Sequence, residues 1–233
     1  NDKVTAKIDI QKRKSTARNH TTTHILHRAL KSVLGDHVNQ AGSMVSNERL
    51  RFDFTHFTAL SSEQIESVEK QVNEIILSDL PVITRVMPVD EAKKEGAMAL
   101  FGEKYGDTVR VVSVGDYSKE LCGGTHLKAS GEAGLIKIIS ENGIAAGVRR
   151  IEALTGTGAL QWYKDRERLL NEVSEAVKTN PDEVLQKVTA LTDELKNTKK
   201  ELEEIKRKMV SSSLDDVLKN SQEVSGIKVV AAR

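Results

Sequence analysis

Short apolar segments of two different periods follow one another through the first two-thirds of the chain. Apolar residues recurring at helical spacing predict two helices, over 17–34 and 61–77. A third, short helix is expected over 90–97. Alternating or β-branched apolar residues predict five strands, over 4–10, 50–54, 82–89, 109–114 and 135–140. Because these elements interleave without a βαβ repeat, we expect an α+β domain with a mostly antiparallel sheet and packed helices.

A single apolar series dominates the last third of the chain. Its members are spaced alternately by four and three residues: Val184, Val188, Leu191, Leu195, Thr198, Leu202, Ile205 and Met209. This spacing is a heptad seam, which buries its apolar side chains against another helix. A preceding helix over 159–178 ends at a turn where Asn180 can cap and Pro181 fits the first helical position. We therefore expect a helical coiled-coil hairpin, although a coiled-coil homodimer would bury the seam equally well.

The composition changes near residue 157 and suggests three parts. All six histidines and most of the glycines precede this point, whereas charged residues dominate after it. We expect one domain over 1–157, a helical connector over 158–219 and the start of a further domain over 220–233, ending in a strand from Ile227. Since the sequence begins with Asn1 rather than methionine, we expect it to be a piece excised from a longer protein.

Composition then restricts the class of protein. The 233 residues carry a net charge of +1 and a mean hydropathy of −0.39. No apolar run approaches the roughly 18 residues that a membrane-spanning helix needs, which argues against a membrane protein. The single cysteine, Cys122, cannot form an intramolecular disulfide and is compatible with a reducing compartment, so we expect a cytoplasmic protein.

Two short motifs carry the chemistry. His20 and His24 stand four residues apart on a predicted helix and so share one face, while Cys122 and His126 flank a flexible Gly-Gly-Thr turn. Three histidines and one cysteine form a plausible tetrahedral zinc site. Thr21 stands where a zinc protease of this pattern has its glutamate, so peptidase chemistry is disfavoured. If all four side chains bind, the zinc is structural; if one is loose, water or substrate can enter.

Five longer motifs are similar to the editing region of bacterial alanyl-tRNA synthetases. They are HTTTHILH at 20–27, LRFDF at 50–54, GAMALFGEKY at 96–105, LCGGTH at 121–126 and GVRRIEA at 147–153. Free-standing editing proteins and the editing domain of threonyl-tRNA synthetases share the histidine pair and the Cys-x-x-x-His element. The resemblance covers residues 1 to about 158 in order, and extends through the connector. An upstream, ATP-binding aminoacylation domain would lie outside this sequence.

The resemblance implies an aminoacyl-tRNA hydrolase that cleaves serine or glycine from wrongly charged tRNA(Ala). The family's zinc ligands match His20, His24, Cys122 and His126, and positions associated with editing match Gln40 and Arg149. Thr23 resembles a pocket-wall position. Each of these three residues also has a purely structural interpretation. Gln40 would be an ordinary turn glutamine, Arg149 a surface salt-bridge residue, and Thr23 a helix-face hydroxyl without substrate contact.

Discrimination against alanine needs polar recognition, because serine is larger than alanine and glycine is smaller. Thr23 and Gln40 are candidates to bond the serine hydroxyl, which leaves the discrimination of glycine from alanine unexplained. Phosphates of the tRNA acceptor end would be met by Arg149-Arg150 and by cations near the start of the chain: Lys3, Lys7, Lys12, Arg13, Lys14 and Arg18. Aromatic residues are only 3% of the chain, which argues against stacking on several bases.

Two classes of function therefore compete. The first is the editing hydrolase, and the alternative is a tRNA-binding and dimerisation module in which zinc is purely structural. A free-standing editing protein is disfavoured, because a β-rich opening piece is absent from the sequence and the final strand is cut short.

Overall fold

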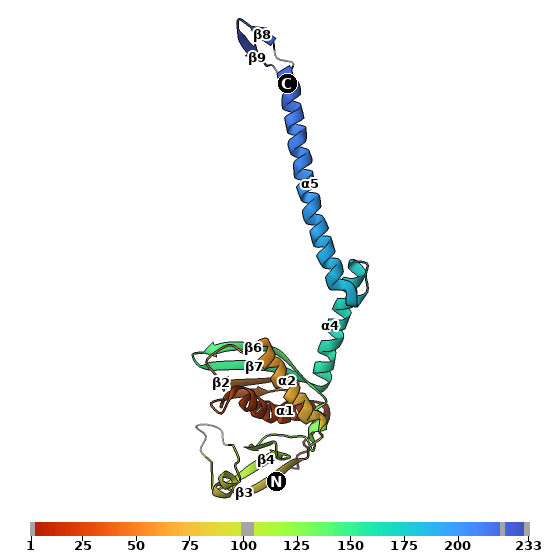
Figure 1. The fold of residues 1–233 in the computed structure, drawn as a ribbon. Helices are drawn as coiled ribbons and strands as arrows, with labels where there is room; N and C mark the ends of the chain where they lie inside the picture. The colour runs from red at the N-terminus through yellow and green to blue at the C-terminus, as the bar shows by residue number, and fades with distance from the viewer. Residues whose placement is uncertain (1–2, 99–104, 220–221, 231–233) are drawn as a thin grey trace. The chain divides into compact units, whose positions relative to one another are not determined.

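A computed structural model describes residues 3–98, 105–219 and 222–230 (Figure 1). The chain divides into two compact units, Asn1–Lys164 and Asp165–Arg233. This division lies inside a helix and does not test the three functional parts expected from the sequence, which stay a prediction.

The first unit contains three helices, the start of a fourth, and seven strands among its described residues. In chain order these are α1 (Ile10–Leu34), β1 (Gln40–Val45), β2 (Leu50–Thr55), α2 (Ser62–Leu77), β3 (Val82–Pro88), α3 (Val89–Lys94), β4 (Thr108–Val114), β5 (Ser118–Leu121), β6 (Ile136–Ala145), β7 (Val148–Thr155) and α4 (Gly156–Ala176). A short 3₁₀ turn, η1 (Ser130–Ala133), precedes β6. All strand pairs are antiparallel, in one sheet of order β1-β2-β7-β6 and another of order β3-β4-β5. The α+β class is confirmed, with two sheets in place of the single one expected.

The main core lies between the four-stranded sheet and helices α1 and α2. Leu50, Phe52 and Phe54 alternate along β2 and are fully buried, and Ile151 of β7 lies opposite Phe52. Helix α2 is fixed at its start by a capping box in which Ser61 and Gln64 satisfy each other's backbone N–H groups. Helix α1 packs against this sheet and also contacts β5.

The strand expected over 4–10 is not formed, and residues 3–9 are irregular. The side chain of Asp9 accepts a hydrogen bond from the backbone N–H of Lys12, which starts α1 at Ile10, seven residues earlier than expected. Val4 and Ile8 are 90% and 60% exposed. Their alternation therefore has no sheet to face, which is why the pattern misled.

Three strands of the first unit were missed by the sequence pattern, namely β1, β5 and β7. In β7 the outward positions hold Arg150 and Glu152, and Arg149 interrupts the apolar face. In β5 the buried positions are Ser118 and Glu120 together with Leu121. Polar residues on both faces of these strands hide the alternation that normally indicates a strand.

The second unit contains the remainder of α4, a 3₁₀ turn η2 (Pro181–Glu183), the long helix α5 (Val184–Lys219) and a hairpin of β8 (Gln222–Val224) and β9 (Ile227–Val229). Pro181 occupies the first position of η2, but the side chain of Asn180 makes no capping hydrogen bond, contrary to expectation. The predicted strand at 227–233 is formed as far as Val229, and residues 231–233 lie outside the described ones.

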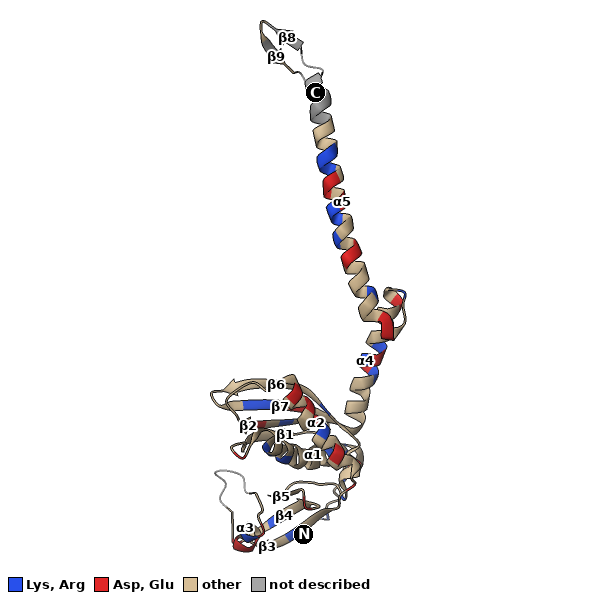
Figure 2. Ribbon diagram, in the orientation of Figure 1, with Lys and Arg blue, Asp and Glu red and all other residues tan. Residues whose placement is uncertain are grey.

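The heptad seam lies on α5, and its apolar side chains are exposed to solvent. Val188, Leu191, Leu195, Leu202, Ile205 and Met209 are between 40% and 66% exposed. Lysine, arginine, aspartate and glutamate are interspersed along the same helix (Figure 2). Because no described residue buries the seam, the coiled-coil hairpin and its homodimer alternative both stay predictions. No helix among the described residues is long and apolar enough to cross a bilayer.

Candidate metal centre

The four side chains expected to bind zinc come together at one point. His20 and His24 project from α1, and Cys122 and His126 stand in the loop that follows β5. One nitrogen or sulfur atom from each residue lies within 4.8 Å of all the others. The Cys122 Sγ atom is 3.4 Å from His20 Nε2 and 3.3 Å from His126 Nε2. Residues separated by about 100 positions in the sequence therefore form one compact donor set.

Arg110 of β4 fixes the loop that carries the cysteine. Its Nη1 donates hydrogen bonds to the carbonyl oxygens of Cys122 and Gly124, at 2.8 Å and 2.7 Å. The backbone N–H of Cys122 donates to the carbonyl of Arg110 at 2.9 Å. One arginine therefore holds both ends of the turn between the cysteine and the second glycine.

Thr21 fixes the ring of His126. Its Oγ1 is 3.1 Å from His126 Nδ1 and accepts a hydrogen bond from the backbone N–H of Leu127 at 3.1 Å. Thr21, at the position where a zinc protease has its glutamate, therefore orients the His126 ring. Such contacts behind the ligands set the direction of an imidazole toward a metal.

Burial favours the neutral form of the three imidazoles. Burial lowers the pKa of His20 to about 4 and that of His126 to about 2, with the neighbouring histidines adding to the effect. Burial also lowers the pKa of His24, whose Nδ1 is buried without a hydrogen-bond partner in the described structure. Neutral imidazoles and a cysteine thiolate are donors that zinc prefers, so the residues present fit a zinc ion.

Two further residues lie close to His24 and were not anticipated from the sequence, namely Glu120 and His27. Glu120 of β5 is 4% exposed, with its Oε2 3.7 Å from His24 Nε2 and its Oε1 3.1 Å from His27 Nδ1. Burial would raise the pKa of Glu120, but the proximity of His24 and the bond from His27 bring it below its ordinary value. The only sequence signal for either residue was its position. Glu120 stands two residues before Cys122, and His27 follows His24 by about one helical turn.

The other three predicted site residues lie elsewhere. Gln40 begins β1 and Arg149 lies on β7, and both are register partners of Phe54 on the strand between them. Gln40 Nε2 donates to Ser43 Oγ at 3.1 Å. No described hydrogen bond or ion pair joins either residue to the four donors.

Arg149 and Thr23 both have internal partners. Arg149 forms a two-pronged ion pair with Glu141, at 2.5 Å and 2.6 Å. Thr23, 3% exposed on α1, donates its hydroxyl to the carbonyl of Asn19 at 2.8 Å. Their roles in editing stay predictions.

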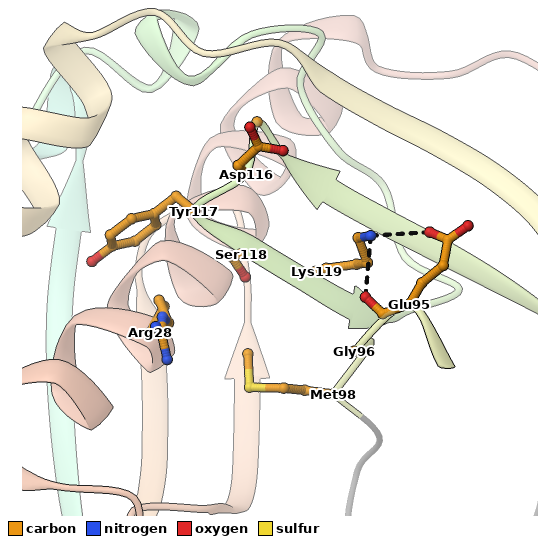
Figure 3. Close-up of a pocket in the computed structure, with 9 residues that line it drawn as sticks. Arg28, Glu95, Gly96, Met98, Asp116, Tyr117, Ser118 and Lys119 are labelled. Carbon is orange, nitrogen blue, oxygen red and sulfur yellow. Dashed lines mark hydrogen bonds and ion pairs between the residues drawn. The ribbon is translucent and has the colours of Figure 1, made fainter. Parts of the chain in front are cut away.

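A cavity of about 320 Å³ lies beside the β4–β5 turn, and none of the four donors lines it. It is lined by residues of α1, of the β4–β5 turn and of the segment before 99, including Arg28, Glu95, Tyr117 and Lys119 (Figure 3). Lys119 Nζ bonds Glu95 Oε2 at 3.0 Å, and the lining residue Ser118 has its Oγ 3.5 Å from Glu120. The wall is polar and its opposite charges balance.

Comparisons with known proteins agree on one family. Residues 109–152 match the family model described as the threonyl and alanyl tRNA synthetase second additional domain. The chain is 58% identical over 230 residues to an alanine–tRNA ligase of Acetivibrio thermocellus, covering 99% of the chain and 26% of that protein. It is 51% identical over 229 residues to one of Clostridioides difficile (98% and 26%) and 50% identical over 232 residues to one of Pseudoalteromonas translucida (100% and 27%). The chain spans about a quarter of the length of these relatives.

Proposed function

We propose that this chain, which is homologous along nearly its whole length to one segment of bacterial alanine–tRNA ligases, is an editing module. The reaction would be hydrolysis of the ester that joins serine or glycine to tRNA(Ala). Residues 1–157 would form the deacylase, 158–219 the coiled-coil connector and 220–233 the start of a further domain.

The observation that carries the proposal is the four-residue donor set. His20, His24, Cys122 and His126 are gathered from α1 and from a loop about 100 residues away, with one donor atom of each within 4.8 Å of the rest. A bound zinc ion would supply an electrophile for the ester carbonyl or an anchor for the amino acid. The protein itself contributes neutral imidazoles, an oriented His126 ring and a cysteine loop clamped by Arg110.

Selection of serine would depend on hydroxyl chemistry near the donor set. Thr23 lies one residue before His24, and although its hydroxyl donates to the Asn19 carbonyl, its oxygen retains acceptor capacity for a serine hydroxyl. Gln40 would act together with Arg149, since both flank Phe54 in the sheet. Alanine would leave the recognising groups without a partner, which makes its ester the poorer substrate.

Cations on the early part of α1 and the segment before it support binding of the tRNA acceptor end. Lys3, Lys7, Lys12, Arg13 and Lys14 are all exposed, and Arg18 is half-buried with its Nε bonded to the Glu132 carbonyl. They precede His20 on the same helix or next to it. Phosphate contacts from such residues would make binding weaken as salt concentration rises.

The alternative is a tRNA-binding and dimerisation module whose zinc is purely structural. It is favoured by the exposed heptad seam of α5 and by a donor set that can close four-coordinate around the ion. Hydrolysis of seryl- and alanyl-tRNA(Ala) by the zinc-loaded chain, beside a Cys122→Ala variant, separates the two functions. Turnover specific to the seryl ester supports editing, and a folded, zinc-loaded chain without turnover supports the alternative.

A further inference from the structure

Glu120 is a buried carboxylate that the four-donor set does not explain. It lies on β5 with only 4% of its surface exposed, and its neighbours along the strand are Lys119 and Leu121. Burying an ionised carboxylate is unfavourable unless other groups compensate its charge. Its described side-chain neighbours are His27, His24 and Ser118, at 3.1 Å, 3.7 Å and 3.5 Å. Two of these three are histidines on one face of α1.

His27 holds Glu120 in place. It follows His24 by three residues, is 5% exposed, and its ring centroid lies 5.2 Å from that of Phe52. Its Nδ1 faces Glu120 Oε1, while its Nε2 is buried without a hydrogen-bond partner in the described structure. The described hydrogen bond of the His27 ring is therefore the one to the Glu120 carboxylate. With one oxygen fixed in this way, the other oxygen of Glu120 is directed to the His24 ring.

The negative charge of Glu120 would balance positive charge at the metal centre. A zinc ion and a Cys122 thiolate together carry one net positive charge, and the guanidinium of Arg110 lies close enough to act electrostatically on His20, His24 and His126. Together these would be two positive charges in a partly buried site, where charges are screened poorly. Among the described residues, Glu120 is the carboxylate that pairs with the ring of His24, with its Oε2 3.7 Å from Nε2.

We propose that Glu120, fixed by His27, is the charge-balancing and positioning residue of the metal centre. It orients the imidazole of His24 and offsets the positive charge of bound zinc and Arg110. The proposal rests on the zinc site of the proposed function but does not require hydrolysis. It predicts that the site holds zinc more tightly than its four donors would alone.

Zinc affinity, measured by competition with a chromophoric chelator, tests the proposal without any use of activity. Glu120→Gln keeps the shape and removes the charge, and we expect it to weaken zinc binding about 10- to 100-fold. Glu69→Gln is the matched control, because Glu69 of α2 is also a largely buried carboxylate in an ion pair, with Lys137 of β6, and belongs to neither the donor set nor its contacts. It should bind zinc like the wild type. The visible spectrum of the cobalt-substituted Glu120→Gln protein should shift, whereas that of the control should not.

Variants of His27 give a second, independent measurement. His27→Leu removes the group that holds Glu120 and should weaken zinc binding, while His27→Asn retains an N–H donor close to the Nδ1 position and should restore most of the affinity. Equal zinc affinities of wild type and Glu120→Gln would overturn the proposal, as would equal affinities of the two His27 variants should Glu120→Gln fail to fold. Wild-type protein that binds no zinc would refute both this proposal and the zinc site. A clear Glu120 effect in a chain that hydrolyses no ester would refute only the editing function.

Discussion

Gly124 and His20 lie in direct contact across the metal centre. A Cβ atom built on Gly124 would stand 1.8 Å from His20 Cε1 and 2.3 Å from His20 Nδ1. Real side chains do not approach this closely, so the loop after β5 reaches the histidine helix only because this position has no side chain. A Cβ atom at the neighbouring Gly123 would have no other group within 4 Å among the described residues.

Alanine at these two glycines should therefore have opposite outcomes. Gly124→Ala should displace His20 from the donor set and weaken zinc binding by at least about 10-fold, a change comparable to the loss of contacts that orient a ligand. Gly123→Ala should bind zinc like the wild type. Isothermal titration or chelator competition measures both. Similar affinities for the two variants would show that the loop is not packed against His20.

The metal-free protein should lose stability as the pH falls. Burial lowers the pKa of His20 to about 4 and that of His126 to about 2, from 6.5 in the unfolded chain. Between pH 6.5 and about 4 the unfolded chain therefore binds more protons than the folded one, so acid favours unfolding. The free energy of unfolding should fall by up to about 1.4 kcal/mol per pH unit for each histidine.

Urea unfolding with a chelator present, at several pH values across this window, measures that slope. His20→Asn removes one of the buried bases and should flatten the dependence. A wild-type slope no steeper than that of the variant would mean that the imidazoles are not held neutral by burial.

Recognition of the serine hydroxyl should depend on Thr23 and Gln40. Thr23→Val and Gln40→Ala each remove one hydrogen-bonding group, so the preference for seryl over alanyl esters of tRNA(Ala) should fall by about 2- to 10-fold for each. Thr22→Val is the matched control on α1, because the Thr22 hydroxyl is buried without a partner in the described structure. Rates of release of the two amino acids provide the ratio. An unchanged ratio in both variants would remove these residues from the recognition site.

The seam of α5 should mediate association of two chains. Leu195 and Leu202 are 55% and 49% exposed on the described chain, and apolar residues at heptad spacing bury against another helix. The wild type should sediment as a dimer, and Leu195→Asp combined with Leu202→Asp should sediment as a monomer. Lys200→Asp, on the opposite side of the helix from the seam, should leave the dimer intact. A wild type that is monomeric at tens of micromolar would instead favour a hairpin within one chain.

Sequence patterns succeeded where one local signal was enough. The Ser61 capping sequence and an apolar stripe define α2, and the spacing of His20 and His24 defines half of the metal centre. The helix starting at Ile10 was misjudged because an alternating segment lacks, in sequence, any sign of whether a partner strand exists. The β7 strand was missed because Arg149 interrupts its apolar face.

The contacts behind the ligands were beyond sequence reasoning for a different reason. Glu120 gains its meaning only when β5 packs beside α1 and places a buried carboxylate against His24 and His27. Arg110 and Gly124 likewise act through a loop that is defined by tertiary contacts. The donors were predictable from spacing and family resemblance, and their supports depended on packing.

We propose above all that this chain hydrolyses wrongly charged tRNA(Ala) at the Cys122 site. The most direct measurement is the rate at which the zinc-loaded chain releases serine from seryl-tRNA(Ala), compared with alanine from alanyl-tRNA(Ala) and with the Cys122→Ala variant. We predict rapid release of serine, slow release of alanine, and loss of serine release in the variant. Equal release of both amino acids, or undiminished release by the variant, would contradict the account.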